Sequence, residues 1–112
     1  MTLNHIHLHV RDLNAAVRWF DTILRIRPGF QNDRIATFSF DAMTVIIDAA
    51  DADAPATLGF SSEDCDHDFN TVIGLGAVAI DPPANKEWGV RAAYFKGPGA
   101  LKCEIEGPLT SC

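Results

Sequence analysis

The chain has 112 residues, which suits one domain or two small fused repeats, and its apolar fraction of 47% is ordinary for a globular protein. Nine basic residues stand against 15 acidic ones, so the formal charge of −6 argues against nucleic acid and against an anionic membrane as partners. No apolar run approaches the roughly 18 residues that span a bilayer. The first residues lack a signal-peptide pattern, and the three cysteines form no CxxC pair, so we expect a cytoplasmic protein.

The first half of the sequence predicts a strand, a helix and three further strands. Residues 3–10, LNHIHLHV, alternate between polar and apolar side chains and place three histidines on one face of a strand. Asp12 is a good N-cap for the amphipathic helix that follows, which the Arg-Pro-Gly stretch at 27–29 stops. Three short strands joined by tight turns are expected within residues 30–48.

The second half repeats this pattern after a small-residue, acidic stretch. Residues 49–56, AADADAPA, are interpreted as a linker between repeat one, about residues 1–48, and repeat two, about residues 57–110. Repeat two is expected to contain a helix at 63–76, a loop at 82–89, and strands at 57–62, 77–81, 90–97 and 100–107. A half of about 50 residues would bury little core alone. We therefore predict a single α+β domain over residues 1–112, in which two β-α-β-β-β repeats form paired curved mixed sheets around a cleft, with the helices outside.

Three stretches of the sequence carry a resemblance to a known family. They are LNHIHLHVRDLNAAVRWFDTIL near the start, DPPANKEWGVRAAYF, and the closing FKGPGALKCEIEGPL, which ends in a strand with a glutamate. In this order and spacing they resemble the vicinal oxygen chelate superfamily, also called the glyoxalase, bleomycin-resistance and dioxygenase superfamily. The resemblance spans nearly the whole chain and supports the repeated fold, which hosts many chemistries.

The resemblance implies either one divalent metal in the cleft, such as Zn, Ni, Fe or Mn, or a cleft that has lost it and has no cofactor. The metal ligands would come from the first and last strands of each repeat. Two implied positions fall on His5 and Glu104, which are suitable ligands. The other two fall on Thr57, a poor ligand, and on Ile47, which cannot ligate. Asp48 is adjacent to Ile47, but strand parity is expected to point it to the opposite face unless a bulge intervenes.

Alternation along the strands independently places His5 and Glu104 on the cleft side. His7 shares the face of His5, so the metal set would be His5, His7 and Glu104 with open positions for a substrate. The alternative is a metal-free cleft with the histidines as hydrogen-bonding walls. Glu104 beside His5 is also a candidate catalytic acid–base pair, or an ordinary hydrogen bond. Cys103, on the other face of the last strand, is expected to be a buried, inert thiol.

Five residues are candidates for contact with a substrate. His7 and Thr57 belong to cleft-facing strands, and Arg91 could clamp an anion in bidentate fashion if it also faces the cleft. Trp88 is either an aromatic wall of the pocket or an anchor of its loop. Phe38 either lines the cleft or fills the core, which is the more usual place for a phenylalanine.

Three functions remain open on this basis. The protein could bind a small organic molecule in its cleft with an incomplete metal site. It could be a metal-dependent lyase, isomerase or dioxygenase that uses His5 and Glu104. It could also be a sequestering, resistance-type binder whose pocket forms between two chains. The missing ligands at Thr57 and Ile47 favour the first and third, whereas the His-x-His row supports the second. The resemblance further implies a homodimer.

Overall fold

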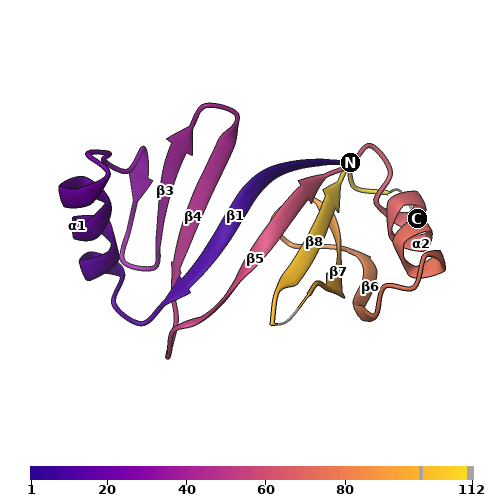
Figure 1. The fold of residues 1–112 in the computed structure, drawn as a ribbon. Coiled ribbons are helices and arrows are strands. Elements are labelled where there is room, and N and C mark those ends of the chain that lie inside the picture. Colours follow the sequence, from indigo (N-terminus) through magenta and orange to yellow (C-terminus); the bar gives the residue numbers. More distant parts are fainter. Residues whose placement is uncertain (99, 111–112) are drawn as a thin grey trace. The chain divides into compact units, whose positions relative to one another are not determined.

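The structure, a computed structural model, describes residues 1–98 and 100–110. Its elements come in two similar series (Figure 1). The first contains β1 (Thr2–Val10), α1 (Leu13–Ile23), β2 (Phe30–Gln31), β3 (Ile35–Phe40) and β4 (Met43–Ala49). The second contains β5 (Ala54–Ser61), α2 (Cys65–Gly74), β6 (Ala79–Asn85), β7 (Arg91–Lys96) and β8 (Lys102–Gly107). Two compact units result: a first unit of His5–Ala56, and a second unit of Met1–Asn4 with the described residues from Thr57 onward.

In the first unit the strands lie in the order β2-β3-β4-β1 (Figure 1). β1 runs parallel to β4, while β3 pairs antiparallel with both β2 and β4. α1 packs against β3 and β4. The apolar stripe of the helix and the alternate apolar residues of the strands meet in one core, because each side would otherwise expose its apolar face to water. The buried members of this core are Leu13, Phe20, Ala36, Phe38 and Ile47.

The second unit repeats this arrangement with the strand order β5-β8-β7-β6. β5 runs parallel to β8, while β7 pairs antiparallel with β8 and β6. α2 packs against β6, β7 and β8, and its buried core consists of Cys65, Phe69, Ala93 and Ile105. The predicted α+β class and the two mixed β-α-β-β-β repeats are confirmed. The predicted cleft between curved sheets stays a prediction.

Both helices begin at an aspartate. The side chains of Asp12 and Asp64 each accept a hydrogen bond from the backbone N–H three residues on, at 2.9 and 3.1 Å, and so satisfy a donor that the helix leaves open. α1 ends at Ile23, before the expected Arg-Pro-Gly stop, because Arg25 takes a left-handed backbone conformation with φ 58°. Within the described residues, neither helix is long and apolar enough to cross a membrane.

The largest departure from the predicted elements is β6. The sequence predicts a strand at 77–81 followed by a loop, whereas β6 continues through Pro82 and Pro83 to Asn85. Proline cannot donate a ladder hydrogen bond, so it is tolerated only at edges and bulges. β6 is the last strand in the order of its unit, and its register with β7 shifts between Asp81 and Ala84. The prolines are therefore compatible with this strand. β5 also begins earlier than expected, at Ala54, inside the stretch interpreted as a linker.

Candidate functional site

Three histidines follow one face of β1 in the first unit. The rings of His5 and His7 meet edge to face with centroids 5.1 Å apart, and the rings of His7 and His9 stack at 6.2 Å. His5 is buried, with 6% of its surface exposed, while His7 and His9 are half-buried. Leu8, between two of the histidines in sequence, packs on the core under α1. The predicted alternation of this strand is confirmed.

Asp48 lies on the histidine face, which corrects the expectation from parity. In the parallel register, Asp48 stands opposite His9, whereas Ile47 stands opposite Leu8 and is fully buried in the core under α1. The expectation placed Ile47 on the histidine face and Asp48 on the other. Ile47 instead points to α1, and because neighbouring residues of a strand point to opposite faces, Asp48 lies on the histidine face. The first repeat therefore carries a carboxylate on the same face as its histidines.

The Asp48 carboxylate holds His7 in one orientation. Its Oδ2 lies 3.0 Å from Nδ1 of His7 and 3.8 Å from Nδ1 of His9. An ionised carboxylate can only accept hydrogen bonds, so Nδ1 of His7 carries the proton. In the neutral ring this leaves the lone pair on Nε2. A histidine fixed in this way presents Nε2 as a metal ligand or a base.

Glu104 is the corresponding carboxylate of the second unit. It lies on β8 opposite Gly59 of β5 and Tyr94 of β7, and only 5% of it is exposed. The hydroxyl of Tyr94 donates to Oε2 of Glu104 at 2.5 Å, the length of a strong hydrogen bond to a charged acceptor. Burial, followed by this bond and by the Glu104 charge, raises the pKa of Tyr94 far above its usual value. Tyr94 therefore stays protonated and keeps one carboxylate oxygen fixed.

Thr57 lies on the same face of the second unit as Glu104. It stands opposite Lys102 of β8, two residues before Gly59 on β5, and only 6% of it is exposed. Gly59 opposite Glu104 adds no side chain to this face. The second unit thus presents a buried carboxylate with small residues on its β5 side and Tyr94 on its β7 side.

The sequence matches no known protein-family profile and no curated protein. Solved structures do share its architecture. A variant of the Streptomyces coelicolor methylmalonyl-CoA epimerase in complex with 2-nitronate-propionyl-CoA is 12% identical with a TM-score of 0.71, over 98% of this chain and 96% of that one. The methylmalonyl-CoA epimerase from Mycobacterium tuberculosis is 16% identical with a TM-score of 0.68, over 97% and 89%. The chain has the vicinal oxygen chelate fold.

The vicinal oxygen chelate fold is also matched by a protein described with another activity. A chain described as the NAD-dependent benzaldehyde dehydrogenase from Legionella pneumophila is 15% identical with a TM-score of 0.75, over 95% of this chain and 99% of that one. At these identities the matches establish the fold, and the activity must be argued from the side chains. The predicted resemblance is confirmed at this level.

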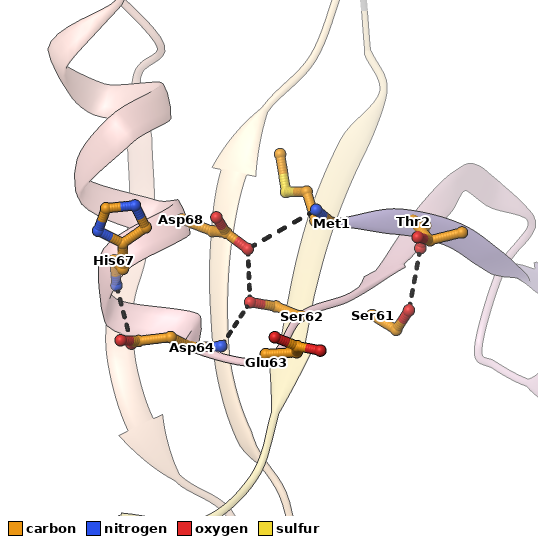
Figure 2. A pocket seen from close by; sticks show the side chains of 8 residues that line it. All are labelled: Met1, Thr2, Ser61, Ser62, Glu63, Asp64, His67 and Asp68. Carbon is orange, nitrogen blue, oxygen red and sulfur yellow. Dashed lines mark hydrogen bonds and ion pairs between the residues drawn. The ribbon is translucent and has the colours of Figure 1, made fainter.

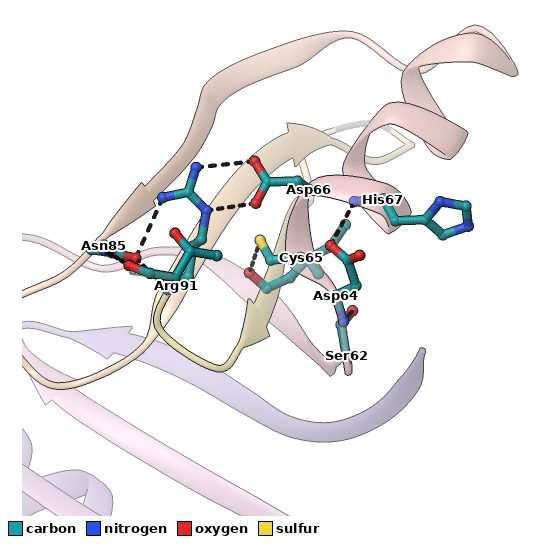
Figure 3. A network of polar contacts seen from close by, with 9 residues as sticks. Ser62, Asp64, Cys65, Asp66, His67, Asn85 and Arg91 are labelled. Atoms are coloured by element: carbon teal, nitrogen blue, oxygen red, sulfur yellow. Dashed lines mark hydrogen bonds and ion pairs between the residues drawn. The ribbon is translucent and has the colours of Figure 1, made fainter. Parts of the chain in front are cut away.

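Arg91 is engaged by the helix of its own unit. Its Nε and Nη2 donate to the two carboxylate oxygens of Asp66 at 2.6 and 3.0 Å, and Nη1 donates to Asn85 at 3.3 Å (Figure 3). Ala93 and Phe95, on the same face of β7, pack in the core under α2. Arg91 therefore lies on the helix side of β7, opposite to Tyr94. The guanidinium of Arg91, which could clamp an anionic substrate if it faced the cleft, binds the Asp66 carboxylate.

Two aromatic candidates occupy different environments. Phe38 is fully buried, and its ring stacks on Phe20 of α1 with centroids 4.5 Å apart, which is the core position considered for it. Trp88 lies in the turn between β6 and β7, and 63% of it is exposed. Neither side chain belongs to the faces that carry the histidines or Glu104.

The two cysteines in the described part of the chain are buried thiols. Burial raises the pKa of Cys65 to about 11, helped by the neighbouring Asp66, and burial also raises the pKa of Cys103. A nucleophilic cysteine needs a lowered pKa and access. The prediction that Cys103 is buried is confirmed, and its inertness stays a prediction.

A polar pocket of about 440 Å³ lies at the start of α2 (Figure 2). Two of its three carboxylates serve the local structure, since Asp64 caps the helix and Asp68 accepts a hydrogen bond from Ser62 at 2.5 Å. His67 is an exposed residue that borders the pocket. No residue proposed for the site lines this pocket, which is bordered by Met1, Thr2, Ser61, Ser62, Glu63, Asp64, His67 and Asp68.

Proposed function

We propose that the protein binds one divalent cation through His5, His7 and Glu104 and uses this centre to hold a small organic molecule. Among the residues that the structure describes, these three are histidine and carboxylate side chains that could hold one ion. The observation that carries the proposal is the Asp48 contact with Nδ1 of His7, because it leaves Nε2 as the ligand atom beside the His5 ring.

The donor set fits a first-row divalent metal. Two imidazoles and one carboxylate suit Zn, Fe(II), Mn and Ni, and three protein ligands leave positions open for a substrate. The Tyr94 hydroxyl donates to Oε2 of Glu104 and so orients this carboxylate. On the β5 side of Glu104 the neighbouring side chains, Thr57 and Gly59, are small.

A bound divalent cation supplies Lewis-acid polarisation of an oxygen of the ligand. The role of the chain is to orient the donors: Asp48 fixes His7, and Tyr94 fixes Glu104. An enzymatic activity would then belong to the metal-dependent lyases, isomerases or dioxygenases. Two proteins of the same fold are described in complex with acyl-CoA compounds, which agrees with a small organic ligand.

A metal-free binding protein is the second candidate. It is favoured by Thr57, which occupies the position where the first strand of repeat two would supply a ligand. In this case His5, His7 and Thr57 would bind the molecule by hydrogen bonds alone. A resistance-type version would form its pocket between two copies, and we propose a homodimer in either case. Sedimentation velocity would detect it as twice the 12.2 kDa chain mass.

Metal titration of chelator-treated protein separates the two candidates. We expect one Zn, Mn, Ni or Fe(II) ion per chain by calorimetry and elemental analysis. His5→Ala, His7→Ala and Glu104→Gln should each weaken binding at least 10-fold, because each removes one of three ligands. His67→Ala, which removes an exposed imidazole from α2, is the matched control. Absence of stoichiometric binding for all four metals, or equal weakening by the control, would leave the metal-free binder.

A further inference from the structure

All three lysines of the chain lie on or next to β7 and β8, the two paired strands that carry Tyr94 and Glu104. The sequence contains nine basic residues, and the other six are arginines at distant positions of the sequence or, for Arg91, on the opposite face of β7. The three are Lys86 before β7, Lys96 at the end of β7, and Lys102 at the start of β8. Carboxylates also lie around this tyrosine, since Asp81 of β6 pairs with Tyr94 and β8 carries Glu104 and Glu106.

Two of the lysines, Lys86 and Lys102, approach the ring of Tyr94, which lies on the face of β7 away from α2. Nζ of Lys102 lies 4.4 Å and Nζ of Lys86 lies 5.7 Å from the centroid of the Tyr94 ring. Lys96 follows Tyr94 by two residues and therefore shares its face of β7. It stands directly opposite Lys102 in the β7–β8 register. The ammonium groups of Lys86 and Lys102 thus approach the Tyr94 ring, and Lys96 projects from the same face of β7 two residues further along.

This arrangement is unfavourable for the chain by itself. Like charges directly opposite each other on paired strands destabilise a sheet. Within the part of the chain that the structure describes, no carboxylate oxygen lies within 4.0 Å of any of the three ammonium nitrogens. Contact with an aromatic ring is weaker than a hydrogen bond to an anion, so the ammonium groups keep the capacity to bind one. Asp81, Glu104 and Glu106 lie near Tyr94 but do not come within ion-pair distance of these ammonium groups, so an anion from outside the chain could still bind them.

The charges along β8 are ordered. On this face the strand carries Lys102, then Glu104, then Glu106, whose partners on β7 are Lys96, Tyr94 and Ala92. The positive end therefore lies next to Glu104, the carboxylate of the proposed metal centre. Tyr94 links the two, since its ring contacts the lysines and its hydroxyl donates to Glu104.

We propose that Lys86, Lys96 and Lys102 bind the anionic group, a carboxylate or a phosphate, of the small organic molecule that the protein holds. This inference rests on the proposed function and adds the chemical class of the ligand. Lysine acts as a mobile point charge with three donors, so the site accepts either anion. The ligand would place its anionic group at the lysines and an uncharged oxygen towards Glu104.

The test uses metal-free protein, so that it does not depend on the cation. The probes are inorganic phosphate and malonate, added at low ionic strength while the lysine Cε and Nζ signals and the Tyr94 ring are followed by NMR. We expect saturable shifts at Lys86, Lys102 and Tyr94, with an affinity that falls as NaCl is added. The tighter of the two probes identifies which anion the ligand carries.

Matched charge removals complete this test. Lys86→Gln and Lys102→Gln should each weaken binding of the tighter probe at least 5-fold, whereas Arg18→Gln on exposed α1 should not change it. Shifts that do not saturate with either probe, or equal weakening by the α1 control, would overturn the lysine site. If metal titration fails while these results hold, the anion site stands and the metal centre does not.

Discussion

At the scale of single residues, Asp48 is the side chain that changes the interpretation of the histidine row. A strand of alternating histidines has no inherent preference for which ring nitrogen is exposed. The 3.0 Å contact between Oδ2 of Asp48 and Nδ1 of His7 removes that freedom. Without it, His7 would distribute its proton between both nitrogens, and its usefulness as an Nε2 ligand would fall.

We predict that Asp48→Ala changes the tautomer of His7 in metal-free protein. At a pH where the ring is neutral, the wild type should show protonated Nδ1 and bare Nε2 in two-bond ¹H–¹⁵N spectra. The variant should show a mixture or the opposite tautomer, because the carboxylate acceptor is gone. In metal titrations we expect a loss of 10- to 100-fold in affinity, as for other partners of metal-bound histidines.

Two controls assign this effect to the carboxylate. Asp33→Ala removes an exposed aspartate from the turn before β3 and should leave the His7 spectrum unchanged. His9→Ala removes the more distant neighbour of Asp48 and should preserve the tautomer of His7. An Asp48→Ala protein whose His7 keeps a protonated Nδ1 would show that the contact does not set the tautomer.

The sequence alone predicts the strand face of some of these side chains and not of others. Alternation assigns the histidines to one face of β1, and Glu104 and Cys103 to opposite faces of β8. Strand parity alone predicts the wrong face for Asp48. Its orientation depends on the register between β1 and β4, which no local sequence pattern encodes. The side occupied by Arg91 depends on which face of β7 packs on α2. The grouping of all three lysines within residues 86–102 is a signal that the sequence does contain.

At the scale of elements, the helices and most strands follow from periodicity and caps. Asp12 predicts the start of α1, and alternating apolar residues predict the strands of both halves. β6 could not be predicted, because its prolines are typical of a loop. Their presence in a strand depends on β6 lying at the end of the strand order with an irregular register, which is a property of the assembled unit.

The ion pair between Asp66 of α2 and Arg91 of β7 leads to a prediction about how the stability of the protein depends on pH. Asp66 lies in the first turn of α2, and its hydrogen bonds to Arg91 hold the pKa of its carboxyl below the usual value. A carboxyl with a lowered folded-state pKa contributes stability above its unfolded-state pKa, and this contribution disappears as pH falls through the folded-state value. Asp66→Asn should therefore lower the Tm at pH 7, and the difference from wild type should shrink on acidification.

Thermal melts followed by circular dichroism from pH 7 to pH 2.5 would measure this difference. Asp51→Asn, in the exposed loop between β4 and β5, is the control and should melt like the wild type. A Tm difference for Asp66→Asn that stays constant across the pH range would mean that the ion pair does not provide the stability. In that case the amide would act through the start of the helix instead.

At the scale of the whole molecule, the repeat is not a pair of separable domains in sequence. The boundaries between the two units fall inside β1, after Asn4, and inside β5, after Ala56. Residues at the start of the chain therefore belong to the second unit, where the hydroxyl of Ser61 donates to the carbonyl of Thr2 at 3.3 Å. A cut in the loop at 50–53 divides the sequence into its two repeats but removes these residues from the unit they belong to.

We therefore predict that the fragments 1–52 and 53–112 do not fold cooperatively alone. The core clusters beneath α1 and α2 contain five and four buried residues among those described, and no disulfide joins the described cysteines. Domains of about 50–60 residues with so little core and no cross-link are at the margin of stability. Far-UV circular dichroism melts should show a sigmoidal transition for the intact chain and a shallow, non-cooperative decline for each fragment. A fragment that melts sigmoidally within a few degrees of the intact chain would establish that repeat as an independent folding unit.

Adding residues 1–4 to the N-terminus of 53–112 then tests whether the start of β1 is what the fragment lacks. Recovery of a transition would assign the deficit to those four residues, and continued non-cooperative melting would assign it to the size of the core.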